Sequence, residues 1–262
     1  MNPELFDSYR LDRQDIAIEG FALEALPHLR RHLPAEGEAL LCFTRLTPGQ
    51  ELAQVREQIA HFSALRRDFE WKVYELDQPA NLKSMLEAEG FVADESEVFM
   101  LYPLQRKPET REALAAQSLP AGVELRRITD AAQLPDVLRV QELIWGRNFD
   151  WLHDKLAASL AQPDAMSMFC AYAEGQPIGT GWTDYPPGSR YPELHGGAVL
   201  PEWRGRGVYS ALFQVRFEEA RARGFDWMAV DASPMSHPIL LAMGFLPVCM
   251  TWPLRYRQPA SA

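Results

Sequence analysis

The sequence predicts an α/β (α+β) fold in which a smaller unit precedes a larger, related one. Apolar residues in 123–262 recur at helical spacing in some segments and at strand spacing in others, so helices and strands alternate there. The segment 105–122 is polar and alanine-rich and has no such period, which predicts a linker. The predicted organisation is therefore an N-terminal unit at 1–104, the linker, and a second unit at 123–262.

Each element of the second unit follows from its local pattern. Val208, Ala211, Leu212 and Val215 lie at i, i+3, i+4 and i+7, which is one face of a helix. Gly244 suits a left-handed cap at the end of a shorter helix. In chain order we expect a strand at 123–128, helices at 131–146 and 151–162, strands at 166–175, 176–185 and 194–200, a helix at 208–223, a strand at 227–233, a helix at 237–245 and a last strand at 246–254.

Bulk composition limits the classes of protein to consider. A chain of 262 residues with 47% hydrophobic side chains suits one large or two modest globular domains. No window approaches 18 consecutive apolar residues, and the first residues lack a secretory-signal pattern, so we expect a cytoplasmic protein with no membrane partner. The three cysteines lie far apart and no HExxH is present, so we expect neither a disulfide framework nor a metal site.

The net charge of −10 is concentrated in the first part of the chain. Residues 1–122 hold 21 acidic and 13 basic side chains, whereas residues 123–262 hold 15 and 13. A broad nucleic-acid surface needs clustered lysine and arginine, so we expect no nucleic-acid partner. The balance leaves room for one small basic pocket in the second unit.

The end of the first unit repeats the end of the second. Segments 75–91 and 229–245 align without a gap, with Asp77 matched to Asp231 and a Gly-Phe pair closing each segment. The alternative is a chance likeness between two βαβ units. If the repeat is real, residues 50–53 stand where the second unit has 204–207, and they contain neither glycine nor arginine. The first unit is then predicted to be a shortened copy without that loop. Its apolar helix face would be Leu52, Val55, Ile59 and Phe62.

A glycine-containing loop joins a strand to a helix at residues 198–216. Gly205 and Gly207 allow backbone N–H groups to turn inward where a Cβ would clash. N–H groups at a helix N-terminus lack intrahelical partners and favour an anion such as a pyrophosphate, to which Arg204 and Arg206 would add charge-assisted hydrogen bonds. The alternative is a plain glycine turn with solvated arginines. A Walker A loop is excluded because no GK[ST] is present, and a dinucleotide fingerprint is disfavoured because its third glycine is missing.

With these residues in place, the sequence resembles the GNAT superfamily of acyl-CoA N-acyltransferases. The family's R/Q-x-x-G-x-G/A motif is matched at Arg204 and Gly207, and Tyr209 stands where the family has a small residue. The strand before the motif and the segment 239–245 also resemble the family, and the resemblance covers about 123–257. It implies a mixed, mostly antiparallel central sheet flanked by helices, and it makes the first unit a degenerate, GNAT-like one.

The resemblance also implies where an acyl-CoA would lie. The backbone of one strand end would line the pantetheine arm, and N–H groups of the loop and helix start would hold the pyrophosphate. Acetyl-CoA is the expected co-substrate, with no metal. The implied cofactor-binding residues are Ala198, Val199, Leu200, Arg204, Gly205, Arg206, Gly207, Val208 and Tyr209.

The reaction needs a base for the amine and an acid for the leaving thiolate. Glu193 and His195 lie two apart on one strand face, so either could relay a proton; the alternatives are an exposed carboxylate and a structural imidazole. The family's usual acid, a tyrosine, is replaced by Leu240. Ser233, Ser236, His237 or water could substitute for it, although Ser236 also suits a helix N-cap.

Aromatic residues near the first two helices of the second unit suggest an acceptor site. Aromatic walls with carboxylates suit a cationic amine, while core packing would explain some of these residues equally well. The candidate substrate-binding residues are Trp145, Phe149, Trp151, Trp182, Asp184 and Tyr185.

The function that these features predict is an acetyl-CoA-dependent N-acetyltransferase acting on a primary amine of a small molecule or peptide by direct attack. The alternative, motivated by the missing tyrosine, is a catalytically idle acyl-CoA-binding module with a regulatory or assembly role. Besides the amine substrate, a second copy of the chain in a homodimer is the one partner that we keep as an option.

Overall fold

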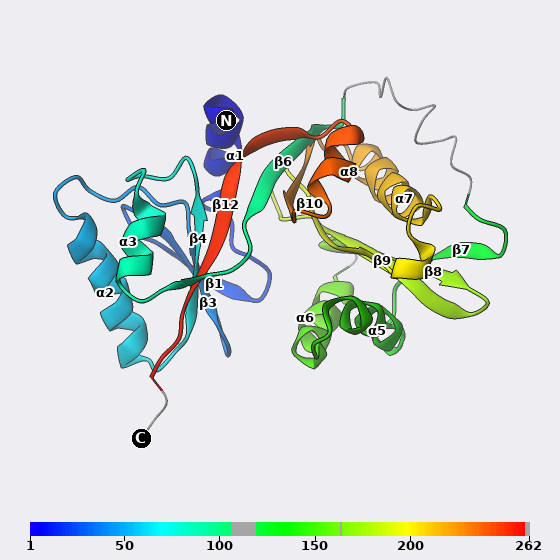
Figure 1. Cartoon of the computed structure of the whole chain (residues 1–262), viewed down its shortest axis with the longest axis horizontal. Coiled ribbons are helices and arrows are strands. Elements are labelled where there is room, and N and C mark those ends of the chain that lie inside the picture. Colours follow the sequence, from blue (N-terminus) through cyan, green and yellow to red (C-terminus); the bar gives the residue numbers. More distant parts are fainter. Residues whose placement is uncertain (106–118, 163, 260–262) are drawn as a thin grey trace. The chain divides into compact units, whose positions relative to one another are not determined.

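The computed structural model describes residues 1–105, 119–162 and 164–259, and the chain forms two compact units (Figure 1). The predicted linker, 105–122, lies mostly outside the described residues. Unit boundaries fall within strands β6 (Glu97–Pro103) and β11 (Trp227–Ala232). The first unit consists of Met1–Met100, Asp231–Leu241 and Leu246–Ala262, and the second of Leu101–Val230 and Ala242–Phe245.

The first unit is a sheet in the order β1-β2-β3-β4-β12. Its neighbouring strands are antiparallel except for the pair β3 and β4, which is parallel. Leucine and aromatic side chains from α2, α3 and the sheet form one buried core, which contains Phe62, Trp71 and Leu86. The elements are α1 (Pro3–Arg13), β1 (Phe21–Ala25), β2 (Arg30–Pro34), β3 (Ala39–Cys42), α2 (Glu51–Ala64), β4 (Phe69–Tyr74), α3 (Leu82–Ala88), β5 (Val92–Ala93), α8 (His237–Ala242) and β12 (Leu246–Tyr256).

The last strand of the chain belongs to the first unit. The sequence predicts a strand at 246–254 that closes the second unit, but β12 pairs with β4 over Thr251–Tyr256. Leu254 of this strand is fully buried in the core of the first unit. The apolar pattern of a strand predicts its buried face and does not specify which strand lies beside it.

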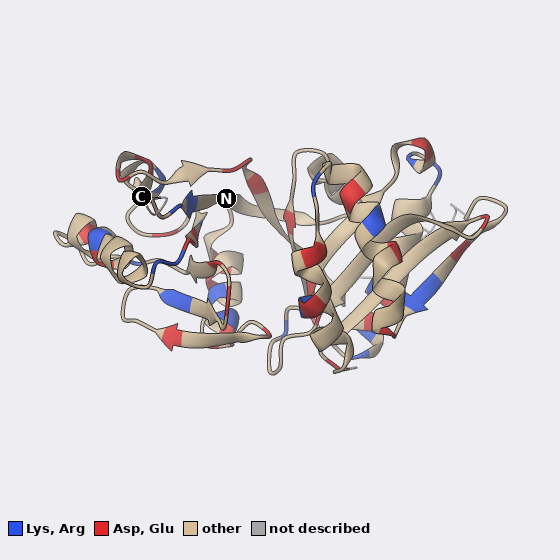
Figure 2. Ribbon diagram, turned by 90° about the horizontal axis from the view of Figure 1, so that it is seen from below, with Lys and Arg blue, Asp and Glu red and all other residues tan. Residues whose placement is uncertain are grey.

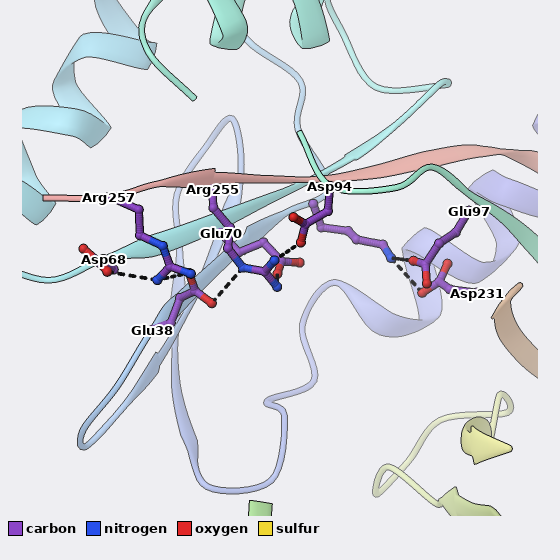
Figure 3. Close-up of polar contacts among 9 residues, drawn as sticks. Glu38, Asp68, Glu70, Asp94, Glu97, Asp231, Arg255 and Arg257 are labelled. Carbon is purple, nitrogen blue, oxygen red and sulfur yellow. Dashed lines mark hydrogen bonds and ion pairs between the residues drawn. The ribbon is translucent and has the colours of Figure 1, made fainter. Parts of the chain in front are cut away.

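Ion pairs hold the end of β12 in place (Figure 3). The Arg255 guanidinium lies 3.1 Å from a Glu38 oxygen and 2.8 Å from a Glu70 oxygen, and it also pairs with Asp94. Arg257, two residues later, lies 2.9 Å from an oxygen of Asp68. Since carboxylates surround both arginines, charge pairing adds to the hydrogen bonds that β12 makes with β4.

A second ionic cluster surrounds the ammonium of Lys72 on β4, and its two carboxylates, Glu97 and Asp231, are labelled in Figure 3. Its Nζ lies 2.9 Å from a Glu97 oxygen and 2.9 Å from an Asp231 oxygen. Burial opposes the charge of Lys72, but these carboxylates outweigh it and raise the pKa of the ammonium. Loss of either acid would leave the buried ammonium of Lys72 with fewer partners. The free-energy cost of that loss exceeds the stabilisation that the intact ion pair provides.

The second unit is a mixed sheet in the order β11-β10-β9-β8-β7, as the resemblance implies. All its neighbouring strands are antiparallel except β10 and β11. Helices α5 and α6 lie on one face of the sheet and α7 on the other (Figure 1). The elements are β7 (Val123–Ile128), η1 (Ala131–Gln133), α5 (Leu134–Trp145), α6 (Asp150–Leu160), β8 (Met166–Ala173), β9 (Gln176–Asp184), β10 (Glu193–Val199), η2 (Pro201–Trp203) and α7 (Val208–Ala222).

Local sequence explains where the helices of the second unit begin and end. Asp130 and Gln133 form a capping box directly before α5, which starts with a proline in its first turn. Gly146 ends α5 in a left-handed conformation. The apolar faces of α5 and α6 then pack on β8 and β9 around residues such as Leu138 and Met168.

Two further properties of the chain are the distribution of its charged residues and the length of its apolar helices. Basic and acidic residues are interspersed along the ribbons of both units in the view of Figure 2. Among the residues that the structure describes, no helix is both long and apolar enough to cross a bilayer.

The position of β12 generates a prediction. Leu254→Ala should destabilise the first unit by about 2–5 kcal/mol, because it leaves a cavity in that unit's core. Hydrogen exchange should accelerate in β4 and be unchanged in β9. The matched control, Leu212→Ala beneath the second unit's sheet, should show the reverse. Faster exchange in β9 alone for Leu254→Ala would contradict the assignment.

Candidate functional site

The loop between β10 and α7 has the conformation that its glycines allow. Gly205 has a φ of 69° and Gly207 a φ of 83°, both in the left-handed region that favours glycine. A Cβ at Gly205 would meet no atom within 4 Å, so backbone conformation and not space requires that glycine. The Ala211 N–H donates to the Gly207 carbonyl in the first bond of this helix start. The N–H groups of residues 208–210 therefore precede the helical ladder and point out of its N-terminus.

The two arginines of the loop are placed differently. Arg204 donates from Nε to the Val199 carbonyl at 3.0 Å, which ties the loop to the end of β10. Arg206 is exposed, and its guanidinium lies 5.1 Å from the Trp203 ring centroid. Arg204 thus shapes the loop, while Arg206 presents its charge to solvent beside the helix start.

A β-bulge interrupts β10 in front of this loop. The register with β9 shifts between His195 and Ala198, and Gly196 within the bulge has a φ of 56°. A Cβ at Gly196 would lie 1.7 Å from the Trp182 ring, so no larger residue fits there. The bulge changes which backbone groups of β10 face its neighbours.

Gln141 fixes the bulge, and it was not among the site residues predicted from the sequence. Gln141 on α5 is 3% exposed, and its Nε2 donates to the Gly196 carbonyl at 2.9 Å and to the Thr180 hydroxyl at 2.7 Å. Its Oε1 accepts a hydrogen bond from Trp145 Nε1. A single polar residue on the buried face of a predicted helix was the signal that could have revealed it.

Beyond its first residue, β10 has an open edge. Glu193 pairs with Ala229 in parallel, and in the described part of the chain this is the one residue pair in register between β10 and β11. On the β9 side, the Leu200 N–H donates to Ile178. Because backbone groups alternate along a strand, the N–H of Val199 faces away from β9. At the end of β10 the Val199 N–H therefore has no strand partner among the described residues, while the Val199 carbonyl accepts from Arg204.

Three of the predicted polar residues come together on one face of the sheet. His195 Nε2 lies 3.5 Å from an Asp184 oxygen and 3.8 Å from a Glu193 oxygen. Burial opposes the imidazolium and so does Lys155 of α6, but the two carboxylates outweigh both and raise the pKa of His195. The imidazole ring stacks on Trp182 at 6.4 Å between centroids.

The remaining aromatic candidates divide into core and surface residues. Phe149 and Trp182 are buried in the core between the sheet and α5 and α6. Tyr185 is also buried, with its hydroxyl 3.0 Å from Ser167 Oγ. Trp145 and Trp151 are 54% and 66% exposed. Packing thus explains the three buried rings, and the two exposed tryptophans are those available to a ligand.

Ser233 and Ser236 lie together at the start of α8. Their hydroxyls are 3.2 Å apart, and Ser233 Oγ accepts a hydrogen bond from the Ser236 N–H at 3.3 Å. Such bonds satisfy donors at a helix N-terminus, which is the capping role. Both serines belong to the first compact unit, whereas β10 belongs to the second.

In the first unit, the strand edge that corresponds to the open edge of β10 is paired. Strands β3 and β4 pair at three successive positions, and a further bridge joins Arg45 to Gln78. Asp77 accepts hydrogen bonds from the Thr44 and Tyr74 N–H groups, and it is buried. The continuation of β3 is therefore fastened to the segment that follows β4.

At the start of α2, side chains of the first unit likewise form hydrogen bonds with groups near the helix N-terminus. Gln54 accepts from the Thr47 N–H at 2.8 Å and donates to the Thr47 hydroxyl at 3.1 Å. The helix N-cap, Gln50, has a φ of −121°, unlike the left-handed Gly207.

Among the described residues of the chain, no group of three or more His, Cys, Asp or Glu side chains is arranged to hold a metal ion.

Comparison with known proteins finds a family model and solved structures that the chain resembles. Residues 135–245 match the model of the acetyltransferase (GNAT) family. A solved GCN5-related N-acetyltransferase from Kribbella flavida is similar over 100% of this chain and 97% of its own, with 16% identity and a TM-score of 0.68. A tandem GNAT protein from the clavulanic acid biosynthesis pathway matches 94% of this chain and 86% of its own, with 17% identity and a TM-score of 0.61. No curated protein matches the chain.

The polar cluster on β9 and β10 generates a prediction about His195. Its pKa, followed by NMR through the imidazole Cε1–H, should lie above the ordinary value of 6.5. Asp184→Asn should lower this pKa because it removes a carboxylate 3.5 Å away. A wild-type pKa below 6.5, or no change in the variant, would contradict the geometry.

Proposed function

We propose that the chain is an acetyl-CoA-dependent N-acetyltransferase of a primary amine, since residues 135–245 match the model of the acetyltransferase (GNAT) family. The observation that carries this proposal is the open end of β10, followed at once by a glycine loop and a free helix N-terminus. An extended pantetheine arm needs an unpaired strand edge, and a pyrophosphate needs unpaired N–H groups. The chain supplies both within residues 198–210.

In this proposal the backbone holds the co-substrate. The N–H of Val199 and the segment 198–200 face the pantetheine arm, while the N–H groups of residues 205–209 hold the pyrophosphate. Arg204 contributes by fixing the loop to Val199, and Arg206 by its positive charge. This division of roles explains why the loop has glycines at positions of positive φ.

His195 is the proposed base. A substrate ammonium must lose a proton before its nitrogen can attack the thioester carbonyl, and neutral imidazole accepts that proton directly or through water. Asp184 and Glu193 stabilise the imidazolium that results. Because these carboxylates raise the pKa of His195, the neutral base becomes abundant only at higher pH. The rate should therefore rise with pH through that raised pKa, and Asp184→Asn should move the rise to lower pH.

The acceptor is proposed to be a cationic amine. The exposed rings of Trp145 and Trp151 offer faces to a cation, and Asp184 and Glu193 add negative charge on the face of the sheet that α5 covers. The three cysteines are reduced and buried, which suits a cytoplasmic enzyme.

A thiol-release assay with acetyl-CoA and a panel of primary amines tests the activity. We expect turnover with at least one cationic amine and none without an amine. The alternative is an idle acyl-CoA-binding module, which Leu240 at the usual tyrosine position motivates. Such a module would bind acetyl-CoA tightly and release no thiol with any amine.

Gly207→Glu tests the pyrophosphate assignment. A carboxylate at the helix start would repel the pyrophosphate, so calorimetry should show acetyl-CoA binding weakened by on the order of 100-fold or more. The matched control is Gly224→Glu, which places the same residue at a φ of 85° just beyond the other end of α7. It should bind acetyl-CoA as the wild type does. Equal affinity of both variants would contradict the assignment.

A further inference from the structure

The phenol of Tyr209 lies against the bulge of β10. Tyr209 is the second residue of α7, and it is half-buried. A Cβ built on Gly197 would lie 3.4 Å from the Tyr209 ring and 3.5 Å from its hydroxyl oxygen. The tyrosine thus stands directly beneath the part of β10 that precedes the proposed pantetheine-binding residues.

A buried arginine lies against the same glycine. Arg216, two turns further along α7, is 1% exposed, and its Nη2 would lie 3.8 Å from the same Cβ position on Gly197. A Cβ on Gly181 would lie only 2.8 to 3.1 Å from the guanidinium, so that glycine provides the space for the charge. Two glycines on adjacent strands therefore admit a cation beneath the bulge.

The charge of Arg216 is not neutralised by an acid among the described residues. Its Nε donates to the Leu212 carbonyl at 2.8 Å, and its Nη1 lies 3.4 Å from the Trp182 carbonyl. Burial lowers the pKa of Arg216, and the nearby phenols of Tyr209 and Tyr185 oppose this effect. Carbonyl partners leave the guanidinium a full positive charge, which favours an anion formed nearby.

The position at which the resemblance implies an acid is apolar. Leu240 cannot donate a proton to a departing thiolate. Burial raises the pKa of Tyr209, and the charge of Arg216 opposes that shift. The phenol is therefore protonated at neutral pH, while the cation stabilises the phenolate that proton donation would leave.

We infer that Tyr209 is the acid that protonates the leaving CoA thiolate, and that Arg216 is the positioning residue that stabilises its phenolate. This inference rests on the proposed function. As the amine nitrogen bonds to the carbonyl carbon, the C–S bond breaks and its electron pair goes to sulfur, which takes the phenolic proton of Tyr209. The phenolate then regains a proton from solvent, while the proton lost by the amine leaves from His195. Amine and acetyl-CoA thus give the amide and CoA, with no other reactant.

Tyr209→Phe tests this role with two readouts. The variant should lower kcat/KM by about 100-fold while leaving the Kd for acetyl-CoA unchanged, because only the acid is lost. The thiol pKa of bound CoA, measured from its alkylation rate against pH, should rise by about one unit, since the phenol no longer donates a hydrogen bond to the thiolate. The second readout needs no amine substrate.

Matched variants separate the role of the hydroxyl from packing. Tyr102→Phe removes the hydroxyl of another ring that packs against α7, beside Phe213 and Phe217, and should leave the thiol pKa unchanged. Arg216→Lys keeps the charge and should preserve that pKa, whereas Arg216→Gln should raise it as Tyr209→Phe does. An unchanged thiol pKa in Tyr209→Phe would overturn the inference, as would equal effects of the two Arg216 variants.

The outcomes also separate this inference from the function on which it rests. Wild-type protein that binds acetyl-CoA but acetylates no amine would contradict the proposed function, and the thiol pKa would still test Tyr209. Full activity of Tyr209→Phe alongside an active wild type would overturn the inference and leave the function standing.

Discussion

The divergence of β10 from β11 is the constraint on which the candidate site depends. Parallel pairing at Glu193 and Ala229 is not continued along these strands, so the end of β10 keeps backbone groups that no strand in the described part of the chain uses. The bulge at Gly196 lies in the same strand. Gln141 of α5 fixes it by donating a hydrogen bond to the Gly196 carbonyl. An unpaired edge is costly unless something binds to it, and an extended ligand is the natural partner.

The first unit shows the other solution to the same problem. Its parallel strands stay paired, and Asp77 satisfies the backbone donors where the strand would otherwise be open. Thr47 and Gln54 satisfy each other at the start of α2. Backbone groups that are satisfied internally have no need of a ligand. The two halves of the chain thus differ in where their backbone hydrogen bonds go, and in the proposed function only the second half binds a ligand.

Local requirements could be predicted from the sequence, and long-range partners could not. Gly205 and Gly207 were predictable because positive φ is a property of each residue and its immediate neighbours. The partner of β12 was not, because the pattern of a strand shows its buried face and not its neighbour. The approach of Asp184 to His195 depends on the register that pairs Glu193 with Asp184 and His195 with Trp182, and no spacing in the sequence records that register. Buried polar residues such as Arg216 also need the structure, because their partners come from other strands.

We propose that one of the two units binds an acyl-CoA and the other does not. Native mass spectrometry of the intact chain, titrated with acetyl-CoA, counts the bound molecules directly. The account predicts that binding saturates at one acetyl-CoA per chain. Saturation at two would show that the first unit also has an open site, and no binding at all would show that the loop before α7 does not hold a pyrophosphate. Either result would contradict the account.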